Sequence, residues 1–303
     1  MAQVLAARPW AAWVRAAGLA WWPIDTLLSA YLAGVGLLVF WNRARVPMAG
    51  ALLALHAAGL ALILLAAWAD RFRTSPAVWV FRHWYPLPYL AACYREMAIL
   101  IPAVRRVDFD AVMARLDLAL WGVYPSLWVE RLYRAWLTEL LQLAYALFFA
   151  AVLGVAWLLW RRGRLEEFRY YAFLLSLGFL SSYLGYFLVP VRGPRFWLAP
   201  VERVPLEGLW LFSGVRGLLD RLESSHWDCF PSGHVAMTLL ACWAARRISP
   251  GLGWVYGLYA ACTLLATVYL RYHYTVDLLA GGLLAAAVLV AAPRLCGRPQ
   301  KGG

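Results

Sequence analysis

About eight long apolar runs recur along the 303-residue chain, and they constrain its fold more than any other feature. Each approaches the roughly 20 apolar residues that a helix needs to cross a bilayer. A soluble core produces one such run but hardly eight. We therefore expect an all-α, polytopic membrane helix bundle with about eight spans, near Asp25–Trp41, Ala49–Ala69, Tyr85–Val104, Trp136–Trp160, Phe168–Val189, Phe230–Ala245, Leu252–Leu270 and Val276–Ala292.

The N-terminal stretch Met1–Trp22 carries Arg8 and Arg15 among Ala and Trp. It has no apolar core of 7–15 residues before a cleavage site, as a signal peptide would have. We expect an interfacial amphipathic helix there.

The formal net charge of +12 would suggest nucleic acid in a soluble protein, but here the Arg residues lie in short loops between apolar runs. This pattern indicates charge that sets the membrane topology, and no nucleic-acid partner.

By the positive-inside rule, Arg161–Arg169, Arg246–Arg247 and the tail after Arg294 lie in the cytoplasm. The intervening loops then lie on the periplasmic, outer or lumenal face. All but one of the 28 basic residues are Arg, which suggests a bacterial inner membrane, with an organelle as the alternative.

Two long segments on that outer face interrupt the helix pattern. Arg105–Arg134 alternates charged and apolar residues, and Gly122 and Pro125 break it into two pieces that we expect to lie flat in the interface. We expect Asp108, Asp110 and Asp117 to form a solvated face there, with binding of a lipid headgroup as the alternative. Val191–Cys229 mixes Arg with acidic residues and is expected to form a cap or lid.

Two motifs converge on the same face. His273 and Asp277 are four residues apart, so they share a helix face if the helix begins by Tyr272. The carboxylate then accepts the imidazole N–H, which fixes the tautomer and leaves the other ring nitrogen as a nucleophile. His273 is thus the predicted nucleophile and Asp277 its orienter.

The string Pro231-Ser232-Gly233-His234 begins another run on that face. Proline suits the first turn of a helix, Gly233 allows close approach of a ligand, and free N–H groups at a helix N-terminus favour an anion. His234 is placed to protonate a leaving alkoxide and later to deprotonate an acceptor, and Ser232 to bond phosphate.

Arg192 and Arg195 lie in a turn stiffened by proline and glycine, and Arg271 lies beside the nucleophile. We expect these three to contact phosphoryl oxygens, because loose phosphoryl-transfer transition states need charge clamps. The sequence contains no Walker loop and the motifs no carboxylate cluster, so the expected reaction needs neither metal nor cofactor. The five cysteines have no spacing typical of zinc or disulfides.

Charged residues within a predicted span cost about 2.5–3.5 kcal/mol each at mid-membrane, which makes them functional candidates by default. Arg95 and Glu96 are therefore candidates for headgroup or lipid contacts, with a structural ion pair as the alternative. His56, inside another span, is expected to be packed and hydrogen-bonded.

The two motifs resemble those of the membrane-bound type 2 phosphatidic acid phosphatase superfamily, and the string His273-Tyr274-Thr275-Val276-Asp277 is similar to that of its inositol phosphorylceramide synthase branch. The resemblance covers roughly residues 108–292. It implies a six-helix catalytic core, a phosphohistidine on His273, acid–base work by His234 and a site on the outer or lumenal face. The chain departs from the family pattern at Thr267, where the superfamily has an arginine.

These observations divide the chain into accessory helices (1–104), a catalytic domain (105–293) and a cytoplasmic tail (294–303). The expected function is transfer of a phosphoryl headgroup from a phospholipid to a lipid hydroxyl of ceramide or diacylglycerol. One alternative is a phosphatase acting on phosphatidic acid or a polyprenyl (pyro)phosphate. A remote alternative is a non-enzymatic lipid transporter or scaffold.

Overall fold

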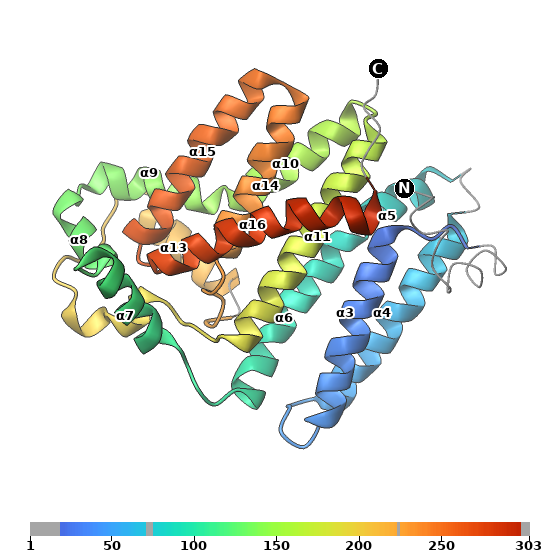
Figure 1. The fold of residues 1–303 in the computed structure, drawn as a ribbon, viewed down its shortest axis with the longest axis horizontal. Coiled ribbons are helices and arrows are strands. Elements are labelled where there is room, and N and C mark those ends of the chain that lie inside the picture. The colour runs from blue at the N-terminus through green and yellow to red at the C-terminus, as the bar shows by residue number, and fades with distance from the viewer. Residues whose placement is uncertain (1–18, 71–74, 223–224, 298–303) are drawn as a thin grey trace.

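Helices and their connecting loops make up the whole of the described structure, a computed structural model that covers residues 19–70, 75–222 and 225–297 (Figure 1). Within these ranges no strand forms, which confirms the predicted all-α class. The predicted interfacial helix at the N-terminus falls almost wholly outside the described residues. The predicted tail does so in part, because the last helix continues to Cys296.

Every predicted apolar run coincides with a helix or a pair of helices. The α-helices are α3 (Pro23–Trp41), α4 (Ala49–Ala69), α5 (Pro76–Trp84), α6 (Pro86–Val104), α7 (Asp110–Trp121), α8 (Pro125–Trp128), α9 (Ala135–Ala146), α10 (Phe148–Arg161), α11 (Leu165–Leu188), α12 (Pro194–Trp197), α13 (Phe212–Leu222), α14 (Gly233–Ile248), α15 (Pro250–Tyr269) and α16 (Thr275–Cys296), with 3-10 turns η1 (Val129–Leu132) and η2 (Ala199–Val201).

Six of the described helices are long and apolar enough to cross a membrane, counting α5 and α6 together. A seventh span forms if α9 and α10, which meet at 44°, are taken as one broken span. The predicted run at Phe230–Ala245 becomes α14, which has only 16 residues and falls below the length of a usual span. Because α14 packs mainly on α15, α16, α10 and α11, it crosses the bundle interior.

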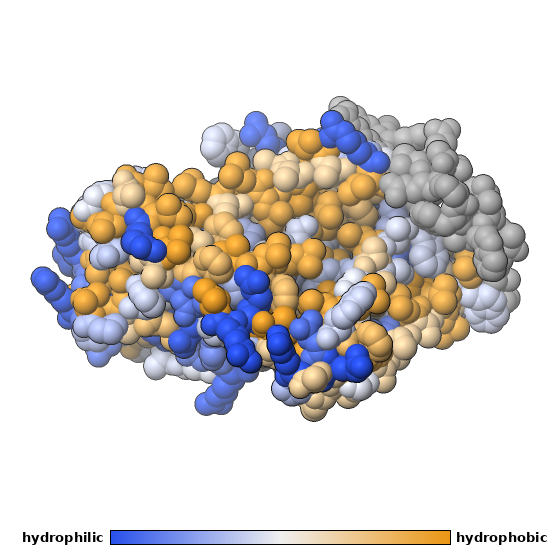
Figure 2. Space-filling view, turned by 60° about the horizontal axis from the view of Figure 1, so that its bottom comes forward, coloured by the Kyte–Doolittle hydropathy of each residue, from blue (hydrophilic) through white to orange (hydrophobic). Residues whose placement is uncertain are grey.

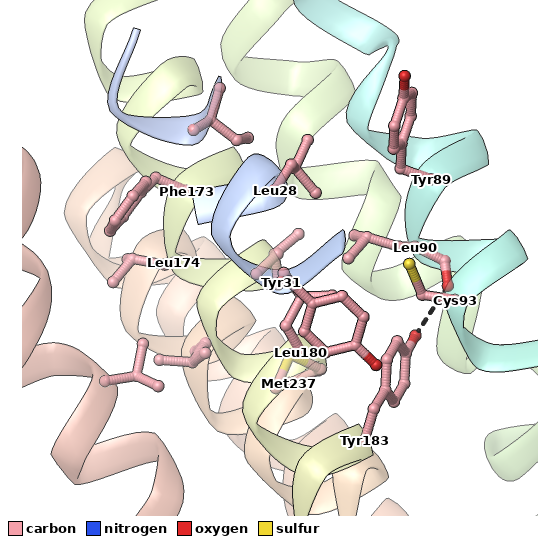
Figure 3. Packing of buried hydrophobic residues seen from close by; sticks show 14 of the residues in the cluster. Leu28, Tyr31, Tyr89, Leu90, Cys93, Phe173, Leu174, Leu180, Tyr183 and Met237 are labelled. Carbon is pink, nitrogen blue, oxygen red and sulfur yellow. Dashed lines mark hydrogen bonds between the residues drawn. The ribbon is translucent and has the colours of Figure 1, made fainter. Parts of the chain in front are cut away.

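Helix α11 is central to the bundle and contacts α3, α6, α10, α14 and α16. Figure 3 shows where α3, α6, α11 and α14 meet, with Leu28, Leu174 and Met237 packed among tyrosines. The Tyr183 hydroxyl donates to the Leu90 carbonyl at 3.2 Å. Aromatic packing, together with this hydrogen bond, ties the accessory helices α3 and α6 to the rest of the molecule.

Hydrophobic side chains cover most of the visible face in Figure 2, and hydrophilic ones gather at its left and lower edges. Residues such as Leu55, Phe149, Trp254 and Leu283 are more than half exposed on their helices. A soluble protein would not expose so much apolar surface, whereas lipid accommodates it.

Successive helices run in opposite directions across the bundle, so their connections fall alternately at its two ends. The loop with Arg161–Arg164 lies beside the last turn of α14, which carries Arg246 and Arg247, since an Arg164 guanidinium N–H reaches the Arg247 carbonyl at 3.5 Å. The ends of α11 and α15 and the starts of α14 and α16 lie at the other end. The two motifs therefore meet there, as the threading of the helices predicts.

The segment after α6 breaks at Gly122 and Pro125 into α7 and α8, as predicted. Helix α7 packs against the start of α16 and against α12. The Val191–Cys229 segment, which we call the lid, contains α12, η2 and α13 joined by irregular loops.

Candidate active site

The His273–Asp277 pair lies where the chain enters α16. The Nδ1 atom of His273 is 3.4 Å from the Oδ2 atom of Asp277. The helix begins at Thr275, later than the predicted start, so His273 stands in the preceding loop. Asp277 nevertheless reaches it, because as the third residue of the helix its Oδ2 accepts the Tyr274 N–H at 2.9 Å. Both side chains are buried.

The other ring nitrogen of His273 faces the first motif. Ser232 Oγ lies 3.3 Å from His273 Nε2, and the same oxygen caps α14 by accepting the Val235 N–H. A proton on Nδ1, facing the carboxylate, leaves the lone pair on Nε2, and the serine hydroxyl then donates to it. The carboxylate thus orients the ring so that a nucleophilic lone pair points toward the N-terminus of α14.

His234 is placed one residue into α14, with its ring centroid 5.9 Å from that of His273. Tyr145 stacks on its ring at 4.4 Å, and Phe148 packs at the same distance. These two aromatic residues flank Leu147, at which the broken span α9–α10 bends. The bend therefore forms the wall that holds His234 beside the other histidine.

Two aspartates of α7 hold the loops of the site. Asp110 accepts the Arg192 and Gly193 N–H groups at 2.8 and 2.9 Å and the Tyr274 hydroxyl at 3.0 Å. Burial raises the pKa of the Asp110 carboxyl, against the opposing effect of these donors.

Asp117, seven residues later, accepts the Thr275 hydroxyl and the Thr275 and Val276 N–H groups at 2.6–3.1 Å. The prediction that Asp110 and Asp117 form a solvated face is wrong: their exposed fractions are 1% and 2%, and only Asp108 is exposed. Together they fasten the Arg192 turn and the His273 loop to one rigid helix.

Arg192 and Arg195 lie on aromatic rings of the lid and the site. Arg192 lies over Phe196 and Trp227, and Arg195 over Tyr272 at 5.0 Å. Arg195 also donates to Asp220 at 2.9 Å, and its backbone N–H bonds the Arg271 carbonyl. Arg195 thus contacts both Arg271 and Tyr272, the two residues that precede His273.

Arg271, expected to face phosphate, is held by the lid in this structure. Its guanidinium donates to Glu130 and Glu202 at 2.8 and 2.9 Å and to the Val204 carbonyl at 2.6 Å. The side chain is buried, and burial raises the pKa of Glu202 against the attraction of the arginine. A contact between Arg271 and phosphate requires exchange of these partners.

Arg95 and Glu96 do not join this cluster. Glu96 is buried against His56, whose Nε2 lies 2.9 Å from a carboxylate oxygen and whose Nδ1 lies 2.9 Å from the Leu32 carbonyl. Arg95 is exposed on α6. The prediction for His56 is confirmed, since it pairs with Glu96, and a lipid contact of Arg95 or Glu96 stays a prediction.

Cys229 lies beside the pair, with its thiol donating to the Tyr272 carbonyl at 3.2 Å. Its Sγ, a ring nitrogen of His273 and an Asp277 oxygen lie within 4.8 Å of one another, a donor set that suits a divalent cation such as Zn²⁺. Burial raises the pKa of this thiol well above its usual value, which opposes formation of the thiolate ligand.

Sequence reasoning missed several residues that shape the site: Tyr145, Phe148, Tyr272, Glu130, Cys229 and the two aspartates of α7. Tyr272, Glu130, Cys229 and the two aspartates lie next to the end of a predicted span or in a segment between spans, whereas Tyr145 and Phe148 lie in the middle of the predicted run Trp136–Trp160. Only the regular spacing of Asp110 and Asp117, two helical turns apart, could have indicated a shared buried face.

A family model described as PAP2 superfamily matches residues 113–291, more than half of the chain. The matched region begins in α7 and contains both motifs. A curated protein of Dictyostelium discoideum described as PA-phosphatase related is 33% identical over 113 residues, which are 34% of this chain and 20% of that protein. The chain thus spans about a fifth of that relative. No solved structure matches. The chain belongs to the PAP2 superfamily.

Proposed function

We propose that this member of the PAP2 superfamily is an integral membrane enzyme that cleaves a lipid phosphoester through a phosphohistidine on His273. The observation that carries the proposal is the contact of His273 Nδ1 with Asp277, with Ser232 Oγ at the other ring nitrogen and the His234 ring 5.9 Å away. All four residues lie within the region matched by the family model.

In the first half-reaction, the Nε2 lone pair attacks phosphorus, and the bond from phosphorus to the leaving alkoxide breaks. Burial lowers the pKa of His234 to about 3, so the negative charge of bound phosphate has to raise it. His234, protonated in the substrate complex, then gives its proton to that alkoxide. The Asp277 carboxylate stabilises the positive imidazole ring of the phosphohistidine. The proton on Nδ1 stays in place throughout, so only the proton of His234 moves.

In the second half-reaction, an acceptor hydroxyl loses its proton to His234 while its oxygen attacks phosphorus and the P–Nε2 bond breaks. The histidines return to their starting states. The acceptor alone decides the product: water gives phosphate release, and a lipid hydroxyl gives transfer of the headgroup.

The phosphoryl oxygens are proposed to lie against the N-terminus of α14, with Ser232 and Gly233, and to be clamped by Arg195, Arg192 and Arg271. In the described structure Arg195 and Arg271 are paired with lid carboxylates, Asp220 and Glu202. Substrate phosphate would replace these carboxylates on the guanidinium groups, so the same arginines serve the lid and the substrate in turn.

We further propose that the acceptor is a lipid hydroxyl, of ceramide or diacylglycerol, as in the inositol phosphorylceramide synthase branch. Burial of His273, 3% exposed, and the lid contacts at Arg271 favour exclusion of water. The donor would be a phospholipid reached from the outer or lumenal leaflet, in a bacterial inner membrane. Hydrolysis of phosphatidic acid or polyprenyl pyrophosphate is the second outcome of the test below.

The test is mass spectrometry of products from purified protein incubated with mixed phospholipids, phosphatidic acid and polyprenyl pyrophosphate, with and without ceramide and diacylglycerol. A headgroup-bearing product that requires the acceptor is the expected result. Release of phosphate that is independent of the acceptor would indicate a phosphatase instead. Equal turnover by the wild type and by His273→Ala, both folded, would exclude the proposed chemistry. Absence of turnover in both would leave the transporter or scaffold reading.

A further inference from the structure

An apolar tip projects from the lid in the loop between η2 and α13. Leu209, Trp210 and Leu211 form this tip, with exposed fractions of 49%, 85% and 53%. Trp210 is the most exposed large hydrophobic residue among those the structure describes. Three consecutive exposed apolar side chains in an otherwise charged segment need a partner that removes them from water.

The tip is held rigidly from below. The buried Glu139 carboxylate of α9 accepts the N–H groups of Leu209, Leu211 and Phe212 at 2.6–3.1 Å. Gly208 lies directly on this carboxylate, where a Cβ would collide with Glu139 Oε2. The turn is therefore fixed with its side chains outward, which a flexible loop does not require.

The tip is continuous with a surface that faces lipid. Helix α9 is the first half of the broken span α9–α10, and its Trp136 and Leu140 are 58% and 53% exposed. Trp136 precedes Glu139 by three residues, so it lies on the side of α9 that carries the tip. The membrane-facing surface of α9 and the tip thus form one apolar surface.

Charge around the tip matches a lipid headgroup layer. Arg134, just before α9, and Arg203, in the lid loop, are both exposed, as is the one acidic residue of this loop close to the tip, Glu207. Tryptophan prefers the membrane–water interface, and arginine at that depth meets lipid phosphates. An apolar turn backed by arginines fits lipid better than it fits the apolar groove of a protein partner.

We propose that the Leu209–Leu211 tip inserts into the interfacial layer of the leaflet on the side of the active site, with membrane lipid as its partner. The tip then anchors the lid to the bilayer, and this anchor remains when substrate phosphate replaces Glu202 on Arg271. This anchoring keeps the lid over His273 while lipid enters beside α9. The inference concerns a membrane contact and holds for either catalytic outcome.

Fluorescence quenching of the full chain in phosphatidylcholine nanodiscs tests it. Trp210→Cys, and Leu209→Cys as a second position, are labelled with bimane, and Arg221→Cys on the exposed far end of α13 is the matched control. The unsubstituted chain measures labelling of the native cysteines. We expect doxyl-labelled phosphatidylcholine to quench the tip positions severalfold more than the control, and iodide to show the reverse order.

Equal access of iodide to the tip and to the control would overturn the proposal. So would protection of the tip from both quenchers, because a protein surface would then cover it. Neither readout depends on turnover, so failure of the proposed reaction leaves this test intact.

Discussion

One carboxylate oxygen of Asp277 serves both the His273 ring and the Tyr274 N–H. Asp277→Asn keeps the size of the side chain but presents an amide, which no longer fixes the tautomer or balances the charged ring. We expect turnover to fall by about 10²–10⁴-fold, by analogy with the orienting aspartate of hydrolase triads.

The measurement is kcat with a saturating lipid donor, with thermal unfolding in detergent as the control for folding. Turnover close to that of the wild type would contradict the orienting role of Asp277.

Asp117 bonds two backbone N–H groups and one hydroxyl at the start of α16. Asp117→Ala leaves those buried donors unsatisfied, at a cost of about 1–3 kcal/mol each in unfolding free energy. We expect a lower midpoint of thermal unfolding together with reduced kcat, because the His273 loop loses its support.

The exposed Asp108, changed to Ala, is the matched control and should behave as the wild type. If Asp117→Ala matched that control in both stability and turnover, the bracing role of α7 would be wrong.

The aspartates of α7 also show why part of the site was not predicted from the sequence. In a soluble protein the polar face of an amphipathic helix meets water, and that rule placed Asp110 and Asp117 outside. Here Leu116, Leu118 and Leu120 are exposed while the aspartates are buried against the site. At a membrane the apolar face can meet lipid and the polar face the protein, so the helix was recognised but its orientation was reversed.

At the scale of elements, α14 and α16 must approach closely for the two motifs to meet. A Cβ on Gly281 would lie 2.6 Å from the Ser232 carbonyl, whereas one on Gly282 meets nothing within 4 Å. We expect Gly281→Ala to separate the helices and to reduce both stability and turnover.

Gly282→Ala is the same substitution on the neighbouring face of α16, where the added methyl group has space. It should leave stability and turnover near those of the wild type. Thermal unfolding and initial rates of the two variants, measured side by side, give the comparison. Equal behaviour of the pair would show that close helix contact is not what positions Ser232.

The spans and the convergence of the motifs were predictable because apolar length and helix alternation are local properties of the chain. The partners of Arg271 were not, since Glu130 and Glu202 are 141 and 69 residues away in sequence. Proximity to His273 suggested a phosphate ligand, but only the folded chain reveals the competing carboxylates, Glu202 in the lid and Glu130 in η1. Long-range pairing of charges has no periodic signal in one sequence.

For the whole molecule, the accessory helices are joined by a buried pair, His56 on α4 with Glu96 on α6. His56→Leu leaves Glu96 unpaired in an apolar interior, and breaking such pairs typically costs about 3–5 kcal/mol. We expect a marked loss of thermal stability, while the double variant His56→Leu/Glu96→Leu recovers much of it.

Differential scanning calorimetry of the two variants in detergent measures the coupling between His56 and Glu96. Residual activity per folded molecule shows whether the active site is affected. If the double variant recovered no thermal stability, the pair would contribute more to stability than one buried polar group offsetting the burial cost of the other.

The central claim, covalent catalysis by His273, is tested most directly by trapping the intermediate. Protein mixed with a donor lipid labelled with ³²P in its phosphate is quenched in alkaline denaturant, and its peptides are mapped by mass spectrometry. The account predicts alkali-stable, acid-labile phosphate on His273 in the wild type and none in His273→Ala. Turnover without label, or label on another residue, would contradict it.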